Sequence, residues 1–193
     1  MNVNLRKIDG PWEHGWVLDK HTLKSTYLGD DAYGHPQYET LRTEVGQATY
    51  LLKYKQDWAQ AGVLAQTLAE NVCPKFESIG FIVPMPASNV RSRQPVNEVA
   101  VALGKILNIP VFEKLLVKVP TGQSLKNLDS KSEKAAAIGN SLSINDQISN
   151  QGKWNVLLID DLFDTGASME AACSTMRSYP KVGNIYVAAL TWK

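Results

Sequence analysis

The chain has 193 residues, of which 44% are hydrophobic and 20% are charged, and its formal net charge is +1. This length suffices for one domain with a substantial core, and a net charge so close to zero gives no electrostatic basis for binding nucleic acid. Because no apolar run approaches a membrane span and the N-terminus lacks the apolar core of a signal peptide, we expect a cytoplasmic protein, either a monomer or a homodimer.

Residues 1–40 are the least regular part of the sequence. Residues 12–18 and 21–28 are typical of two short strands, and residues 29–36 form a strong turn signal. The favoured interpretation is a structural, β-rich N-terminal extension that packs on the main sheet. The alternative is a hood that covers an acceptor molecule.

The pattern becomes helical between residues 40 and 72, with a polar break at 54–57 and a plausible stop at Pro74. Residues 78–83 then predict a buried strand that leads into a proline-containing loop. A helix is expected from about 95 to 107, with Pro95 in its first turn. Cys73 and Cys173 lack the spacing of a metal site, so two buried thiols are favoured over a disulfide.

A short strand is predicted to start at 109–112, with 115–117 as its candidate extension, and a polar, lysine-rich stretch follows at 118–134. Long irregular loops in compact domains are usually functional or disordered. Two interpretations of this loop stay open: a lid that closes over polyphosphate, and a merely solvated loop. Residues 132–142 predict a short helix.

The most informative stretch is 156–168. Four apolar residues lead directly into Asp160 and Asp161, and a Thr-Gly-Ala-Ser turn then opens a helical run. A continuous apolar run is typical of a strand buried on both faces, and ligands of open α/β sheets bind at the carboxyl ends of such strands. The turn would offer backbone N–H groups to a phosphate, and adjacent carboxylates repel each other unless a cation or hydroxyls engage them.

With a final strand at 185–191, the alternation of strands and helices from residue 79 onward predicts a doubly wound parallel sheet in an α/β fold. We expect a single domain over residues 1–193, with a core from 41 to 193. The helical segment 40–72 would cover one face of the sheet.

The 156–168 stretch resembles the signature of type I phosphoribosyltransferases that binds 5-phosphoribosyl-1-pyrophosphate (PRPP). This resemblance implies a PRPP site with Mg²⁺, in which Asp160 and Asp161 hold the ribose hydroxyls and the metal. It implies a 5′-phosphate loop made by Asp164, Thr165, Gly166, Ala167 and Ser168. It also implies a pyrophosphate loop made by Met85, Pro86 and Ala87. The candidate cationic contacts of this loop are Arg91, Arg93 or Lys118.

Two further segments, 50–55 and 83–86, resemble the Leu-Lys-Tyr segment and the Pro-Val-Pro strand end of the ComF-type, amidophosphoribosyltransferase-like subfamily. Asp164 departs from the threonine usual there. Asp-Thr-Gly is instead similar to the hypoxanthine-, guanine- and xanthine-type enzymes, in which the aspartate is a general base on the purine. Residues 190–193 match the Leu-x-x-Lys spacing of those enzymes, whose lysine contacts the purine carbonyl.

The resemblance implies a phosphoribosyltransferase that transfers phosphoribosyl to a nitrogen acceptor, with a purine-like base as one candidate, and releases pyrophosphate. Asp164 is then the candidate catalytic residue. The alternative is a non-catalytic, ComF-type PRPP-binding or accessory protein linked to DNA uptake or repair. A relative of ribose-phosphate diphosphokinases is a third candidate, but the chain is too short for their duplicated architecture.

Overall fold

The computed structural model describes residues 1–87, 91–119 and 141–193. The predicted lysine-rich lid and residues 132–140 of the predicted helix lie almost wholly outside this part. The strands are β1 (Arg6–Lys7), β2 (His14–Lys20), β3 (Thr22–Asp30), β4 (Pro36–Arg42), β5 (Phe81–Pro84), β6 (Leu116–Lys118), β7 (Leu142–Ile144), β8 (Trp154–Phe163) and β9 (Val182–Trp192). The helices are α1 (Glu44–Tyr54), α2 (Ala59–Asn71), the 3₁₀ turn η1 (Cys73–Lys75), α3 (Pro95–Leu107) and α5 (Ala167–Arg177).

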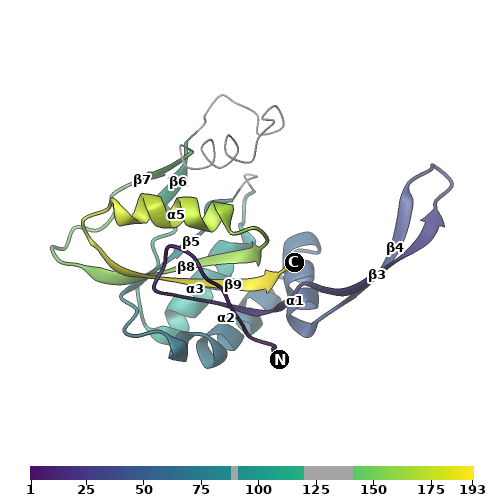
Figure 1. Ribbon diagram of the computed structural model, residues 1–193, viewed down its shortest axis with the longest axis horizontal. Coiled ribbons are helices and arrows are strands. Elements are labelled where there is room, and N and C mark those ends of the chain that lie inside the picture. Colours follow the sequence, from purple (N-terminus) through teal and green to yellow (C-terminus); the bar gives the residue numbers. More distant parts are fainter. Residues whose placement is uncertain (88–90, 120–140) are drawn as a thin grey trace.

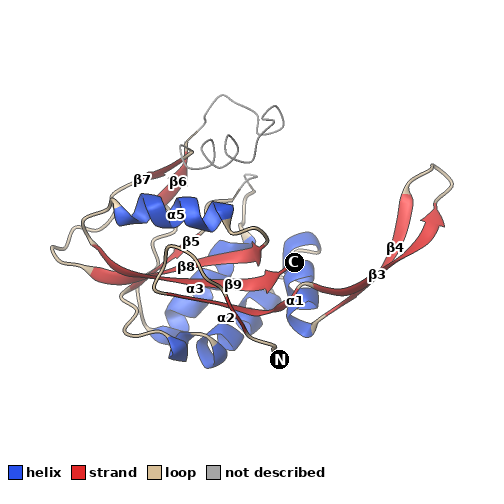
Figure 2. Cartoon of the chain, in the orientation of Figure 1, coloured by secondary structure: helices blue, strands red, loops and turns tan. Residues whose placement is uncertain are grey.

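A five-stranded sheet forms the centre of the molecule, in the order β1-β2-β9-β8-β5 (Figure 2). The β2–β9, β9–β8 and β8–β5 pairs are parallel, and β1 adds an antiparallel edge. The apolar run at 156–159 in β8 is fully buried, as expected for a strand covered on both faces. The predicted doubly wound, mostly parallel sheet is therefore confirmed.

Each face of the sheet carries its own hydrophobic cluster. Helices α1, α2 and α3 pack with Leu157, Ile159 and Tyr186 on one face, and α5 packs with Val156, Leu158 and Val187 on the other (Figure 1). The alternation of these side chains along β8 divides them between the two clusters. Cys73 and Cys173 are both free and buried, one in each cluster, as the sequence predicted.

Three local predictions differ from the structure. The helical pattern was expected to start at residue 40, but residues 40–42 belong to β4, and α1 begins only after Thr43. Leu142 starts β7, which pairs with β6, so it does not end a helix. Residues 109–112 contribute a single bridge, between Val111 and Ile82, in place of a strand.

The N-terminal residues divide between two structures. β2 lies inside the central sheet beside β9, so residues 14–20 are part of the core. β3 and β4 pair as a separate hairpin that extends away from the body (Figure 1). No helix in the described ranges is long and apolar enough to cross a membrane.

Helix α1 is fixed closely to the end of β2. The Thr43 hydroxyl caps the helix by accepting a hydrogen bond from the Gly46 N–H at 2.9 Å, and it donates one to the Lys20 carbonyl at 2.6 Å. Gly46 faces the carbonyl oxygen of His21, where a Cβ atom would lie only 2.1 Å away. This close approach sets the direction of α1 and therefore the position of residues at its C-terminal end.

Candidate functional site

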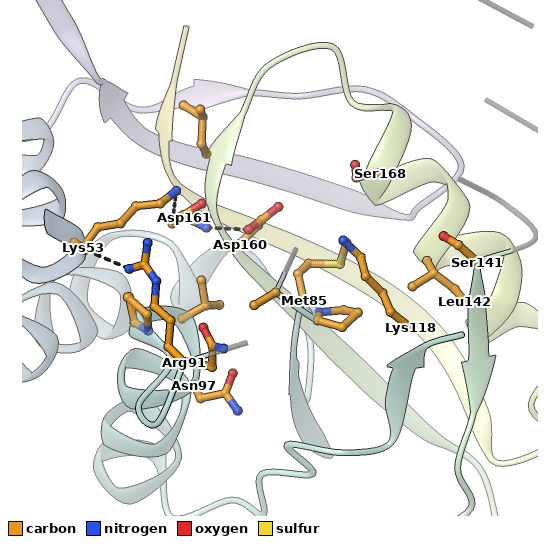
Figure 3. Close-up of a pocket in the computed structure, with 16 residues that line it drawn as sticks. Lys53, Met85, Arg91, Asn97, Lys118, Ser141, Leu142, Asp160, Asp161 and Ser168 are labelled. Carbon is orange, nitrogen blue, oxygen red and sulfur yellow. Dashed lines mark hydrogen bonds and ion pairs between the residues drawn. The ribbon is translucent and has the colours of Figure 1, made fainter. Parts of the chain in front are cut away.

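A cleft of about 360 Å³ lies at the carboxyl end of β8, within the roughly 300–1,000 Å³ typical of ligand pockets (Figure 3). β8 contributes Asp160 and Asp161, and residues 85–87 follow directly from β5. Lys53 enters from α1, and Lys118 enters from β6. The cleft therefore combines two carboxylates with cations from two other elements.

The two aspartates lie side by side and half-buried within the last residues of β8. Burial raises the pKa of Asp160 to about 7, and the neighbouring Asp161 carboxylate adds to this rise. A hydrogen bond from the Asp161 N–H, together with the charges of Lys53 and Lys118, opposes it. The two adjacent carboxylates destabilise the folded chain, and groups with strongly shifted pKa values cluster at functional sites. We therefore treat Asp160 and Asp161 as a candidate functional site.

Lys53 is a site residue that we did not predict. Its Nζ atom lies 2.5 Å from Asp161 Oδ2, and the two side chains are 29% and 14% exposed (Figure 3). The signal was present in the sequence, since Lys53 is the lysine of the Leu-Lys-Tyr segment noted above. The fold brings it to the acids because the last turn of α1 lies over the carboxyl end of the sheet.

A smaller hollow adjoins the cleft and is lined by residues 162–169 together with Asp160. Gly166 precedes α5 with φ 84°, and a Cβ atom there would lie 3.0 Å from the Phe163 ring. Glycine adopts this backbone conformation without strain. The first turn of α5 therefore presents backbone N–H groups beside the exposed Thr165 and Ser168, an arrangement suited to an anion.

The loop at residues 85–87 forms another wall of the cleft. It is continuous with β5, and the Met85 N–H donates to the Ile159 carbonyl at 2.8 Å, which fixes the loop against β8. Lys118 also lines the cleft (Figure 3). Burial lowers the pKa of Lys118, and the Asp160 charge opposes this change.

The two predicted arginines lie in different surroundings. Arg91 lines the cleft and donates to the Lys53 carbonyl at 2.9 Å, so it also holds the end of α1. Arg93 does not line the cleft. Its guanidinium makes two hydrogen bonds to Glu98, at 3.0 and 2.6 Å, and stacks 4.2 Å from the centre of the Trp58 ring.

Asp164 lies on the exposed side of the small hollow. Its carboxylate is 3.5 Å from Lys193 Nζ, and both side chains are more than half exposed. The Lys193 N–H donates to the Phe163 carbonyl at 3.2 Å, so the end of β9 runs beside the start of the loop. Asp164 and Lys193, which the sequence linked to purine-type enzymes, are thus neighbours in the fold.

The donor set at β8 fits a magnesium ion that is shared with a substrate. Among the described residues, no group of three or more His, Cys, Asp and Glu side chains could hold a metal ion. Mg²⁺ keeps several waters and is commonly bound by one or two carboxylates together with substrate phosphates. Asp160 and Asp161 supply those two carboxylates.

Comparison with known proteins gives structural neighbours only. No family model matches the chain, and no curated protein sequence matches it. Adenine phosphoribosyltransferase from Trypanosoma brucei, solved with AMP, pyrophosphate and ribose-5-phosphate, has a TM-score of 0.53 and 14% identity, over 100% of this chain and 76% of that chain. At this identity the likeness defines the fold, which is that of the type I phosphoribosyltransferases.

Two other solved structures are more distant by TM-score. Adenine phosphoribosyltransferase from Leishmania tarentolae has a TM-score of 0.49 and 10% identity, over 98% of this chain and 95% of that chain. UMP synthase from Leishmania donovani has a TM-score of 0.40 and 18% identity, over 81% of this chain. The match spans only 26% of the UMP synthase chain.

Proposed function

We propose that the protein is a phosphoribosyltransferase that binds PRPP with Mg²⁺ and transfers the phosphoribosyl group to a nitrogen acceptor. The observation that carries this proposal is the pair Asp160–Asp161 at the carboxyl end of a buried parallel strand, directly before a glycine-initiated helix N-terminus. Hydroxyl groups or a cation satisfy such carboxylates, and the N–H groups of the helix suit a phosphate. PRPP carries both ribose hydroxyls and a 5′-phosphate.

In this proposal each part of PRPP meets a different element. Asp160 and Asp161 bind the ribose hydroxyls, and residues 164–168 surround the 5′-phosphate. The loop at 85–87 binds the pyrophosphate group, with Arg91 and Lys118 as its cationic contacts. Arg93 has no role here, because Glu98 already binds its guanidinium.

The reaction breaks the bond between C1 of the ribose and pyrophosphate and forms a bond from C1 to the acceptor nitrogen. A bound Mg²⁺ would stabilise the negative charge that develops on the departing pyrophosphate. Lys118 and Arg91, which both line the cleft, add positive charge there. The Asp164 carboxylate accepts the proton that the acceptor nitrogen loses, and Lys193 Nζ lies 3.5 Å from that carboxylate.

The acceptor and the subfamily are further parts of the proposal. The contact of Lys53 with Asp161 supports a functional role for the Leu-Lys-Tyr segment, on which the ComF-type resemblance rests. The proximity of Asp164 and Lys193 supports a purine-like base as acceptor. The two resemblances concern different residues, so one protein can satisfy both.

The test is pyrophosphate release by the purified protein in the presence of PRPP, Mg²⁺ and a panel of purine and pyrimidine bases and small amines. We expect release that depends on PRPP and on one class of acceptor. The Asp160→Asn/Asp161→Asn double variant, purified in the same way, controls for contaminating transferases. PRPP binding without release for any acceptor would refute the transferase and leave a PRPP-binding protein; absence of PRPP binding would refute both.

A further inference from the structure

The acid pair lies on a part of β8 that has a neighbouring strand on one side only. The ladder between β5 and β8 ends where Pro84 pairs with Ile159, whereas the ladder between β8 and β9 continues past the acids to the end of both strands. Among the described strands, only β9 pairs with β8 at Asp160 and Asp161. Contacts from β9 therefore decide how firmly the main chain of the two acids is fixed.

A side chain of β9 supplements this ladder at Asp161. Thr191 is a polar residue with 0% exposure, and its hydroxyl donates a hydrogen bond to the Asp161 carbonyl at 2.8 Å. The same Thr191 oxygen lies 3.1 Å from Nδ1 of His21, the residue that directly follows β2. Two hydrogen bonds therefore connect the main chain of Asp161, through Thr191, to the end of β2.

The direction of these two hydrogen bonds decides which ring nitrogen of His21 carries the hydrogen. A carbonyl oxygen only accepts, so the single hydroxyl hydrogen of Thr191 points to Asp161. The Thr191 oxygen must then accept the second hydrogen bond, which requires a hydrogen on Nδ1 of His21. The hydrogen-bond chain therefore runs in one direction, from His21 to Thr191 to Asp161.

The surroundings of His21 favour the neutral ring. Burial lowers its pKa from the ordinary 6.5, and the charges of Arg42, Lys53 and Lys193 lower it further. The Asp161 carboxylate acts in the opposite direction. At pH 7 the ring is therefore neutral, with its one hydrogen on Nδ1.

His21 is itself held in place by its main chain. Its N–H donates to the carbonyl of the last β9 residue at 2.8 Å, and its carbonyl oxygen faces Gly46, where a Cβ atom would lie only 2.1 Å away. Gly46 belongs to α1, whose last turn brings Lys53 to the Asp161 carboxylate. His21 thus contacts both supports of Asp161: the Thr191 hydroxyl, which holds its main chain, and α1, which holds its carboxylate.

We propose that His21 is a positioning residue for Asp161, which acts through Thr191 to hold the acid in the orientation that a bound ribose requires. His21 does not line the cleft, so it acts on the site through other residues. This inference rests on the proposed binding of PRPP, because the orientation of Asp161 matters only to a ligand that the acid contacts. A merely stabilising contact would change the free energy of unfolding and leave the ligand affinity of the folded protein unchanged.

The tautomer can be tested without any ligand. In ¹⁵N-labelled protein at pH 8, the chemical shifts of the two ring nitrogens of His21 show which one carries the hydrogen. The chain has three histidines, so comparison with the spectrum of His21→Asn identifies the signals. We expect the hydrogen on Nδ1. A hydrogen on Nε2 would remove the donor to Thr191 and overturn the proposal.

The affinity for PRPP tests the positioning role. Calorimetry with Mg²⁺ should give a dissociation constant about three- to tenfold higher for His21→Phe than for the wild type, the effect of one lost hydrogen bond. His21→Asn should stay within about twofold of the wild type, because its amide nitrogen, like Nδ1, is bonded to Cγ and donates. The matched control is His14→Phe, at the start of β2, which should leave the affinity unchanged.

The outcomes separate this inference from the proposed function. Absence of PRPP binding to the wild type refutes the proposed function, and the positioning role fails with it. If the wild type binds PRPP and His21→Phe binds it equally well, the positioning role alone is overturned. A loss in His21→Asn as large as that in His21→Phe overturns it as well, because the retained donor would then make no difference.

A second pair of variants covers the case in which His21→Phe does not fold. Thr191→Val removes the hydroxyl that joins His21 to Asp161, and it should weaken PRPP binding by about tenfold or more, since two hydrogen bonds are lost. Thr191→Ser keeps the hydroxyl and should bind PRPP like the wild type. Equal affinity of Thr191→Val and the wild type would contradict the proposal.

Discussion

The Asp160 carboxyl should make the folded protein less stable as the pH rises. In the folded state burial and Asp161 raise its pKa from the ordinary 3.8 to about 7. Below about pH 4 the carboxyl is protonated in both states and has no effect on stability. Between about pH 4 and 7 the unfolded chain releases this proton while the folded chain retains it, so the free energy of unfolding falls and then levels off.

The magnitude follows from the size of the pKa change. A rise from 3.8 to about 7 corresponds to about 4 kcal/mol. The carboxyl retains part of its contact with water, which screens its charge, so we expect roughly half of this value, about 2 kcal/mol. The Asp160→Asn variant removes the charge and should be more stable than the wild type by about this amount at pH 8.

Urea unfolding of the wild type and of Asp160→Asn, measured from pH 5 to pH 8 without Mg²⁺ or PRPP, tests this prediction. The difference between the two proteins should grow across the range, which separates Asp160 from other titrating groups. Asp164→Asn is the matched control, because that carboxylate is exposed and should show no such trend. If Asp160→Asn is no more stable than the wild type at pH 8, the acid pair is not a strained site.

Three other changes test separate parts of the site. Lys53→Met should lower the free energy of unfolding at pH 8 by about 1–2 kcal/mol, because half-buried Asp161 loses its partner. Lys53→Arg should stay close to the wild type in the same urea titration. Equal stability of all three proteins would contradict this prediction. Gly166→Ala should lower the free energy of unfolding by about 1 kcal/mol or more, since alanine is strained at φ 84°, and the thermal midpoint should fall accordingly. An unchanged midpoint would argue against a constrained turn. If Asp164 takes the proton from the acceptor nitrogen, Asp164→Asn should retain PRPP affinity in calorimetry but lower turnover by about 10²–10⁴-fold. Unchanged turnover would show that Asp164 is not the general base.

The parts of the fold that follow from local pattern were predicted well. The buried run at 156–159, the helix after Gly166 and the two helices between residues 44 and 71 each carry their periodicity in consecutive residues. The alternation of these elements was sufficient to predict the sheet. The acid pair and its loop belong to one short segment, so the sequence shows their proximity directly.

The features that depend on pairing between distant segments were not predicted. Nothing local in residues 14–20 indicates that they lie parallel to β9 inside the sheet. Lys53 reaches Asp161 only because Thr43 and Gly46 fix α1 against the end of β2. These contacts arise from packing, which periodicity and spacing do not encode.

Arg93 shows that the sequence also does not identify which of several partners a side chain contacts. Its place after the 85–87 loop suggested a cationic contact for a phosphate, but Glu98 and Trp58 bind its side chain. Glu98, in the first turn of α3, lies within hydrogen-bond distance of the guanidinium, whereas Arg93 does not line the cleft. The sequence contains both residues, but it does not rank the two partners.

The most direct test of the central claim is isothermal titration calorimetry of PRPP, with Mg²⁺, into the wild type and into Asp160→Asn/Asp161→Asn. We predict binding of one PRPP per wild-type chain and no binding to the double variant. A urea titration of the double variant verifies that loss of binding does not reflect unfolding. Absence of PRPP binding to the wild type, or equal binding to the double variant, would contradict the account.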